Sequence, residues 1–153
     1  MIKMLGCMTV FSAAIYYLLL ERKQYHLEQE TLLMWFSALS RMESMIRWKN
    51  IPLVTLLEKE PLTASVSEML KSKIPLQIAW QNNVAGFDDR QLVKILGDID
   101  FSGDKEKLIR EFHCAQEKLD TLQKERREEH QKTQKVRTSA ILCSAAFLII
   151  LLI

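Results

Sequence analysis

Turn-forming residues are scarce in this sequence, whose 153 residues include only four glycines and three prolines. The glycines never cluster, so the chain lacks the glycine-rich loop that holds the phosphates of a nucleotide. It also lacks alternating β-branched runs joined by an Asn-Gly or Asp-Gly turn, which would indicate a β-hairpin. The sequence therefore predicts an all-α fold, and we do not expect this chain to hydrolyse nucleotides.

Cysteine is sparse as well. The chain has only Cys7, Cys114 and Cys143, with no C-x-x-C spacing. An odd number of scattered thiols is not a disulfide framework, which favours a reducing compartment for the middle of the chain. Cys114 and its neighbour His113 project about 100° apart on a helix and cannot form a nucleophile–base pair. We expect Cys114 to be a buried structural thiol.

Charge is missing from both ends of the chain. Apart from Lys3, every charged residue lies within residues 21–137. Residues 4–20 would form about 25 Å of helix, slightly less than the roughly 30 Å of a bilayer's hydrocarbon core. We expect an N-terminal transmembrane segment at 1–20 and a C-terminal transmembrane segment at 138–153. The alternatives are a cleaved signal peptide for the first run and a buried core helix for the second.

Basic residues flank both uncharged runs on the side toward the middle of the chain. Arg22 and Lys23 follow the first run. The second run is preceded by Lys124, Arg126, Arg127, Lys132, Lys135 and Arg137. Because Lys3 alone lies on the opposite side, the positive-inside rule places residues 21–137 in the cytoplasm and both termini outside. Basic and acidic residues are nearly balanced in this region, which argues against a nucleic-acid partner.

The middle region repeats its apolar residues at the 3.6-residue period of a helix. One helical face carries Leu32, Trp35, Phe36, Leu39, Met42 and Ile46, and a later one carries Leu108, Phe112, Ala115, Leu119 and Leu122. The first of these helices is expected to run on from the membrane segment to about Arg47. Between the two, Pro52 and Pro75 each predict the start of a helix, because proline fits the first helical turn.

Shorter signals predict where the intervening helices begin and end. A helix over residues 53–59 is expected to stop before Pro61. Residues 65–68 and 88–91 match the capping-box pattern of a helix start, and Gly86 suits a helix C-terminus. Together these signals predict five to six helices of unequal length, packed as a compact bundle.

Polar segments join the bundle to the membrane segments. Residues 21–31 and 123–137 carry few apolar side chains, which favours solvated helices that lift the bundle off the bilayer as stalks, with disorder as the alternative. Larger apolar side chains are expected in the bundle core rather than in a groove for a partner helix. These are Met34, Met42, Met45, Met69, Trp35 and Trp48.

The histidines are the candidates for a metal site. His26 and Glu30, and likewise His113 and Glu117, are four residues apart, so each pair shares one helical face. Neither pair belongs to an H-E-x-x-H or E-x-x-H pattern, which would bring further ligands. We therefore predict no catalytic, cofactor-binding or metal residues and no enzymatic activity. A small metal-dependent membrane enzyme using His113 and Glu117 is an alternative.

Three stretches of the chain carry a resemblance to a known family. Residues 36–46, followed by 51–53, look like a first-helix segment that ends in a Pro-Leu turn, Trp80 stands where a tryptophan precedes a loop, and residues 95–102 look like a leucine-glycine segment. In this pattern the chain resembles the stage III sporulation protein AB family of endospore-forming bacteria. It departs from the pattern at Asp100, Gly103 and Lys107, where the family has Gly, Asp and Gln.

The resemblance implies a role at a membrane. The family's cytoplasmic domain is similar to the helical bundle of type II secretion system F proteins, the platform that couples a secretion ATPase to a translocation machine. It implies an oligomeric platform subunit of a mother-cell-to-forespore channel, required for forespore development and bound to a secretion-type ATPase and to other channel subunits. The expected location is the outer forespore membrane, with the bundle in the mother-cell cytoplasm. A general tail-anchored membrane scaffold is the alternative.

Overall fold

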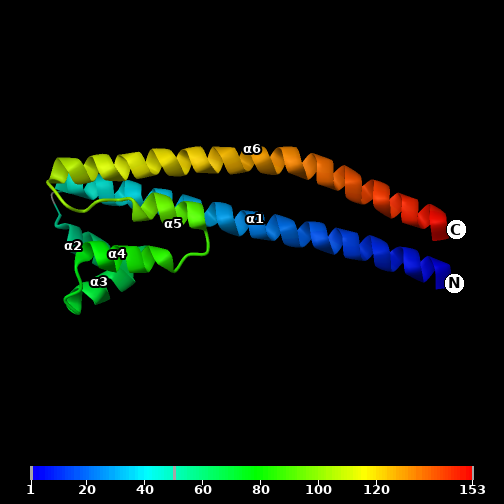
Figure 1. The fold of residues 1–153 in the computed structure, drawn as a ribbon, viewed down its shortest axis with the longest axis horizontal. Helices are drawn as coiled ribbons and strands as arrows, with labels where there is room; N and C mark the ends of the chain where they lie inside the picture. The colour runs from blue at the N-terminus through cyan, green and yellow to red at the C-terminus, as the bar shows by residue number, and fades with distance from the viewer. Residues whose placement is uncertain (1, 50, 153) are drawn as a thin grey trace. The chain divides into compact units, whose positions relative to one another are not determined.

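Helices make up every regular element that the computed structural model describes, which covers residues 2–49 and 51–152 (Figure 1). Side chains are described except at residues 2–7, 10, 11, 145, 148, 149, 151 and 152. The elements are α1 (Ile2–Lys49), α2 (Leu53–Lys59), the 3-10 helix η1 (Pro61–Thr63), α3 (Ala64–Lys71), α4 (Leu76–Ala85), α5 (Arg90–Gly97) and α6 (Lys105–Leu152). The predicted all-α fold is confirmed.

Local sequence signals explain most of these boundaries. Pro52 and Pro75 are the residues immediately before α2 and α4, where their fixed φ and missing N–H are tolerated. Asp89 caps α5, because its carboxylate accepts hydrogen bonds from the backbone N–H groups of Gln91, at 3.0 Å, and Leu92, at 3.3 Å. Gly86 is the C-terminal cap of α4, as predicted.

The predicted capping box at residues 65–68 is wrong. Helix α3 begins at Ala64, and the side chain of its N-cap residue Thr63 makes no capping hydrogen bond. Ser65 already lies inside the helix, and its hydroxyl donates to the side-chain oxygen of Asn83 on α4. A tertiary contact thus replaces the local cap that the sequence pattern suggested.

The chain divides into two compact units. The bundle unit is residues 31–123, and the terminal unit is residues 1–30 together with 124–153. The core of the bundle unit draws on α1, α2, α3, α4, α5 and α6. Its buried members are Leu32, Trp35, Leu39, Met42, Ile46, Leu56, Leu57, Val66, Ala79, Trp80, Val84, Leu92, Leu96, Ile99, Phe112, Ala115, Leu119 and Leu122. The two predicted apolar faces therefore meet in one core, except at Leu108, which is partly buried, and at Phe36.

Several residues expected in the core lie at the surface instead. Phe36, Met34 and Trp48 are exposed, the last at 80% of its full surface. Met34 and Trp48 each follow a core residue by two positions, which turns the side chain about 200° around the helix and away from the core. Cys114 is exposed for the same reason, because it follows buried Phe112 by two positions. The expectation of a buried thiol is therefore wrong.

The terminal unit pairs the first part of α1 with the last part of α6 (Figure 1). The rings of Tyr25 and His130 stack with centroids 3.7 Å apart, and Arg137 forms an ion pair with Glu21. The polar segments 21–31 and 123–137 are helical, so the disordered alternative is wrong.

The two predicted membrane segments lie in this unit. Where side chains are described, no helix is both long enough and apolar enough to cross a membrane. Parts of both segments, including residues 4–7 and 151–153, fall outside the described side chains. The two spans stay a prediction.

Candidate interaction surface

The histidine candidates for metal binding lie among ordinary polar contacts. His113 Nε2 is 3.5 Å from Glu117 Oε1, and its Nδ1 is 3.9 Å from Glu43 Oε2. Glu43 is already bound, because it accepts hydrogen bonds from Gln116 at 2.7 Å and Arg47 at 2.6 Å. Throughout the part of the chain that the structure describes, no three His, Cys, Asp or Glu residues are arranged to hold a metal ion.

His26 and Glu30, the other pair considered for metal binding, have different surroundings from His113 and Glu117. Both side chains are exposed on the polar part of α1. The His26 ring has an edge contact with Tyr25 at a centroid distance of 6.0 Å, and Tyr25 in turn stacks on His130. The aromatic contacts of this region therefore join α1 to α6.

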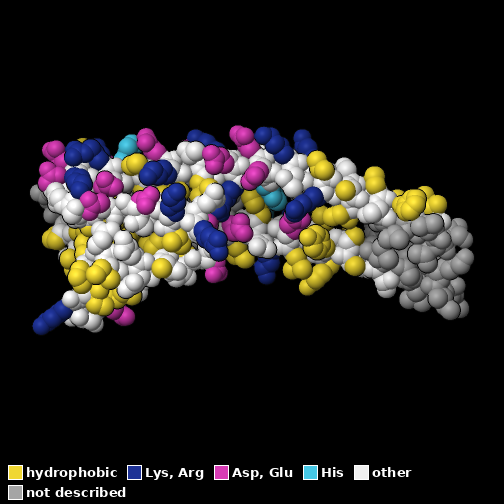
Figure 2. Space-filling view, viewed as in Figure 1, with side chains coloured by type: hydrophobic (Ala, Val, Ile, Leu, Met, Phe, Trp, Pro, Cys, Tyr) yellow, Lys and Arg dark blue, Asp and Glu magenta, His cyan; other side chains and the backbone are white. Residues whose placement is uncertain are grey.

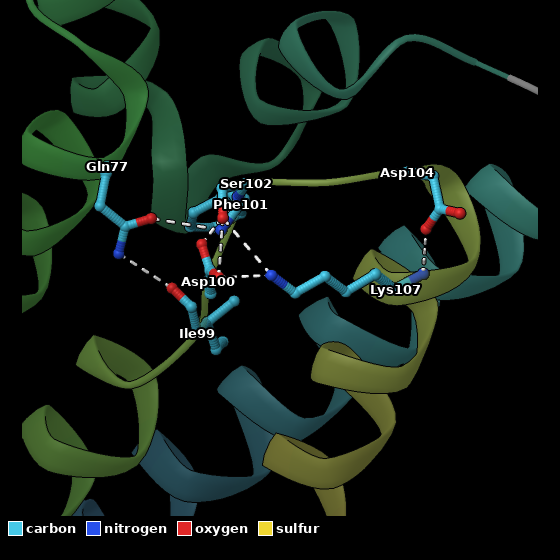
Figure 3. A network of polar contacts seen from close by, with 7 residues as sticks. All are labelled: Gln77, Ile99, Asp100, Phe101, Ser102, Asp104 and Lys107. Atoms are coloured by element: carbon cyan, nitrogen blue, oxygen red, sulfur yellow. Dashed lines mark hydrogen bonds and ion pairs between the residues drawn. The ribbon is translucent and has the colours of Figure 1, made fainter.

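Figure 3 shows the network of polar contacts in the connection between α5 and α6. Gln77 of α4 holds it at two points: its amide nitrogen donates to the Ile99 carbonyl at 3.0 Å, and its amide oxygen accepts from the Phe101 N–H at 3.2 Å. Both ends of one side-chain amide are thus used, so the loop is fixed against α4. Phe101 is thereby placed against Trp80, with ring centroids 5.0 Å apart.

A charged pair closes the same loop. Lys107 Nζ lies 2.6 Å from Asp100 Oδ2, and Ser102 donates to Asp100 through both its N–H and its hydroxyl at 2.8 Å (Figure 3). The hydrogen bond from Lys107 and those from Ser102 hold the pKa of Asp100 well below its usual range. Asp104 then caps α6 by accepting from the Lys107 N–H at 2.9 Å.

The three departures from the family pattern meet in this loop. Asp100 pairs with Lys107, and Gly103 has φ +131°, a conformation that other residues rarely adopt. A Cβ on Gly103 would lie 2.7 Å from Cδ of Lys107. The substitutions at these positions are therefore mutually compatible, since the close approach of Lys107 to the loop needs the glycine.

The segments that resemble the family pattern also make structural contacts. The indole N–H of Trp80 donates to the Leu96 carbonyl at 2.7 Å, which joins two of those segments. Arg41 of the first segment donates to Ser37 at 2.6 Å and forms an ion pair with Glu60, whose hydrogen bond raises the pKa of the Arg41 guanidinium. Residues of these segments thus help to hold the bundle together.

An exposed aromatic residue marks the surface of the bundle unit. Trp48 lies at the end of α1 between two basic residues, Arg47 and Lys49, all three of them exposed. Lys105, at the start of α6, donates to the Arg47 carbonyl at 3.4 Å and adds a third positive charge beside this helix end. Tryptophan and arginine are the residues most enriched among the energetic hot spots of protein interfaces. We call Arg47, Trp48, Lys49 and Lys105 the tryptophan corner.

Further apolar side chains reach the surface of the same unit. Figure 2 shows hydrophobic side chains gathered over the short helices α2, α3 and α4. Val54 of α2 and Ile78 of α4 are both 49% exposed.

The helical period of α1 could have identified Trp48 as exposed, because this residue falls off the stripe that ends at Ile46.

The chain matches a known family model. The model described as stage III sporulation protein AB matches residues 3–153, nearly the whole chain. This match confirms the resemblance inferred from the sequence and is consistent with a role in sporulation. Neither the curated proteins nor the solved structures contained a match.

Proposed function

The chain belongs to the stage III sporulation protein AB family, and we propose that it is the membrane platform subunit of a sporulation-specific, secretion-like channel. In this proposal the bundle unit docks a secretion-type ATPase and other channel subunits, and several copies of the chain assemble together. The platform performs no chemistry of its own. Its site is the outer forespore membrane, with the bundle unit in the mother-cell cytoplasm.

The observation that carries the docking proposal is the tryptophan corner. A tryptophan that is 80% exposed would leave a large apolar surface in water, and covering it with a partner gains free energy. Lys49 and Lys105 add positive charge beside Arg47, whose own charge is paired with Glu43, and this suits a partner surface that is acidic around an apolar pocket. Because the Trp48 side chain is largely exposed, replacing it should leave the bundle folded.

Affinity capture from sporulating cells tests this proposal. The tagged full chain is expected to recover a secretion-type ATPase and channel subunits. Trp48→Ala should lower the recovery of the ATPase at least fivefold, corresponding to about 1 kcal/mol or more. Ile78→Ala is the matched control, since it removes another exposed apolar side chain, on α4.

Each result has a distinct meaning. Failure of the unmodified chain to recover any ATPase or channel subunit would overturn the platform proposal. Equal recovery by the Trp48→Ala variant and the unmodified chain would place the docking face away from the tryptophan corner. Equal losses in the Trp48→Ala and Ile78→Ala variants would indicate a broad, unspecific apolar surface.

Membrane attachment is supported by the uncharged runs at 4–20 and 138–153 and by the basic residues that flank them. Two single-cysteine chains test it, because Cys114 and Cys143 are both exposed in the isolated chain. After reconstitution into liposomes, a membrane-impermeant maleimide should label Cys114 in chains whose bundle faces outward and leave Cys143 unlabelled. Equal labelling of both thiols would contradict a second membrane span.

A further inference from the structure

The terminal unit carries a shallow, open hollow between its two helices. Its volume is about 750 Å³, and it is lined by Arg22 from α1 and by Gln131, Gln134, Lys135, Thr138 and Ser139 from α6. The hollow lies at the border between the charged and the uncharged part of each helix, next to residue 20 on α1 and residue 138 on α6. In the proposed membrane arrangement, this level is the interface between lipid headgroups and water.

The lining of this hollow is suited to an oxyanion. Of its six described lining residues, two are cations, two are amides, two carry hydroxyls and none is an acid. Arg22 lies 3.2 Å from the side-chain oxygen of Gln134, when that amide is oriented to accept, so its guanidinium is held at the hollow. The nearest acidic residue in sequence, Glu21, is neutralised by its ion pair with Arg137. Guanidinium, ammonium and hydroxyl donors together match a phosphate group.

An apolar surface adjoins this polar lining. A second hollow shares Arg22, Gln134 and Thr138 with the first and adds the apolar residues Ile15, Leu18 and Leu19, together with His130 and with Glu21, whose charge is paired with Arg137. Leu19 is 58% exposed, so apolar area is available to cover. A ligand that fills both hollows therefore has a phosphate at one end and a hydrocarbon chain at the other.

We propose that these hollows bind one anionic phospholipid, with its phosphate between Arg22 and Lys135 and an acyl chain along Ile15, Leu18 and Leu19. A free phosphate ester would use only the polar half of the site. The inference rests on the membrane attachment proposed above and adds a defined lipid-binding site to it. Bound lipid would fasten α1 to α6 at the level where charge first appears in both helices.

The full chain in a non-ionic detergent can be titrated against phosphatidylglycerol that is fluorescently labelled on its acyl chain, with binding measured by anisotropy. The double variant Arg22→Gln/Lys135→Gln should bind about tenfold more weakly, because two charge-assisted contacts are lost. The matched control Lys23→Gln/Arg127→Gln removes the same charge from exposed positions outside both hollows and should change affinity less than about twofold. Circular dichroism verifies that both variants remain helical.

Competition identifies the form of the ligand. Unlabelled phosphatidylglycerol should displace the probe, whereas phosphatidylcholine and glycerol phosphate at equal concentration should not. Displacement by glycerol phosphate would mean that the site takes a free phosphate ester, and displacement by phosphatidylcholine would mean that the negative charge is not recognised. Equal weakening in both double variants would show general electrostatic attraction and would also overturn the inference.

A second variant and a second measurement keep the two proposals separate. Leu19→Ser should weaken phosphatidylglycerol binding about threefold by removing apolar contact, without altering the polar lining. Flotation with liposomes reports membrane attachment independently of the site. If the unmodified chain does not float, the membrane proposal fails. If it floats and every variant binds phosphatidylglycerol equally, only the lipid site fails.

Discussion

The two units of the chain are stabilised in different ways. In the bundle unit the large side chains of Trp35, Trp80 and Phe112 are completely buried. In the terminal unit Leu19, Leu27 and Phe147 are each more than half exposed, and the contacts between helices that we describe are polar or aromatic. The bundle unit thus supplies its own apolar environment. The terminal unit leaves apolar surface that only another apolar medium or ligand would cover.

The largest expected effect concerns the bundle core. Trp80→Ala should lower the free energy of unfolding by about 3–5 kcal/mol, because it opens a cavity between Trp35 and Phe101 and removes the indole hydrogen bond to the Leu96 carbonyl. Urea unfolding followed by fluorescence of the remaining tryptophans measures it, since all three tryptophans lie in the bundle unit. Trp48→Ala is the control, with an expected change within about 0.5 kcal/mol. Similar losses in both variants would contradict the assignment of core and surface.

A smaller effect concerns the loop between α5 and α6. Gly103→Ala should destabilise the bundle unit by about 1–3 kcal/mol, because φ is +131° and the added Cβ would meet Lys107. Gly97→Ala should stabilise it by about 0.5 kcal/mol, since Gly97 ends helix α5 and a Cβ there meets nothing within 4 Å. The same urea titration compares the two. If both substitutions changed the free energy of unfolding in the same direction, the two glycines would not differ in backbone conformation as described.

The Asp100–Lys107 pair predicts a pH dependence. Because folding lowers the pKa of Asp100, its carboxylate favours the folded state at pH values above the unfolded pKa of about 3.9. This contribution is lost as the pH falls below that value toward the folded-state pKa. The stability advantage of the unmodified chain over Asp100→Asn should therefore narrow on acidification from pH 5 to pH 2, as measured by urea unfolding at each pH. Asp98, an exposed carboxylate two residues away, is the control. If the stability advantage over Asp98→Asn narrowed with pH in the same way, the effect would not come from the Asp100–Lys107 pair.

The smallest effect is expected in the terminal unit. A double-mutant cycle with Glu21→Gln and Arg137→Gln should give a coupling free energy of about 0.2–1 kcal/mol, because Arg137 is half exposed and solvent screens the pair. Amide hydrogen exchange in residues 21–30 and 124–137 would measure it as a change in local opening. A coupling as large as the loss in Trp80→Ala would show that the terminal unit is held together as firmly as the bundle.

The fold was predictable where a local rule decides the structure. Pro52 and Pro75 act on the residues beside them, and the helices begin where those residues indicate, whereas the cap of α5 is Asp89, one residue later than the capping box at 88–91 predicts. Ser65 misled because its hydroxyl had a partner on another helix, Asn83, which is not visible in a local pattern. Trp48 and Cys114 misled for a different reason: residue type suggested burial, although their positions in the helical period already excluded it.

The candidate surfaces were less accessible to sequence reasoning. The polar hollow draws Arg22 and Lys135 together from helices separated by more than a hundred residues of chain. No spacing rule relates two such positions. Likewise, Gln77 was not a candidate, although it fixes the loop at Ile99 and Phe101. Both sites become visible only after α1 and α6, or α4 and the loop, have packed.

The pairing of the first and last helices has a consequence during synthesis. The short helices α2 to α5 contact their neighbours in sequence and can associate as soon as each leaves the ribosome. Helix α1 emerges first, but its residue Glu43 bonds to Gln116, which lies 73 residues later in the chain. The core residues of α1 likewise share their cluster with Phe112, which is made equally late. During that interval the apolar stripe of α1 has no final partner, so a nascent chain halted before α6 would expose it to chaperones.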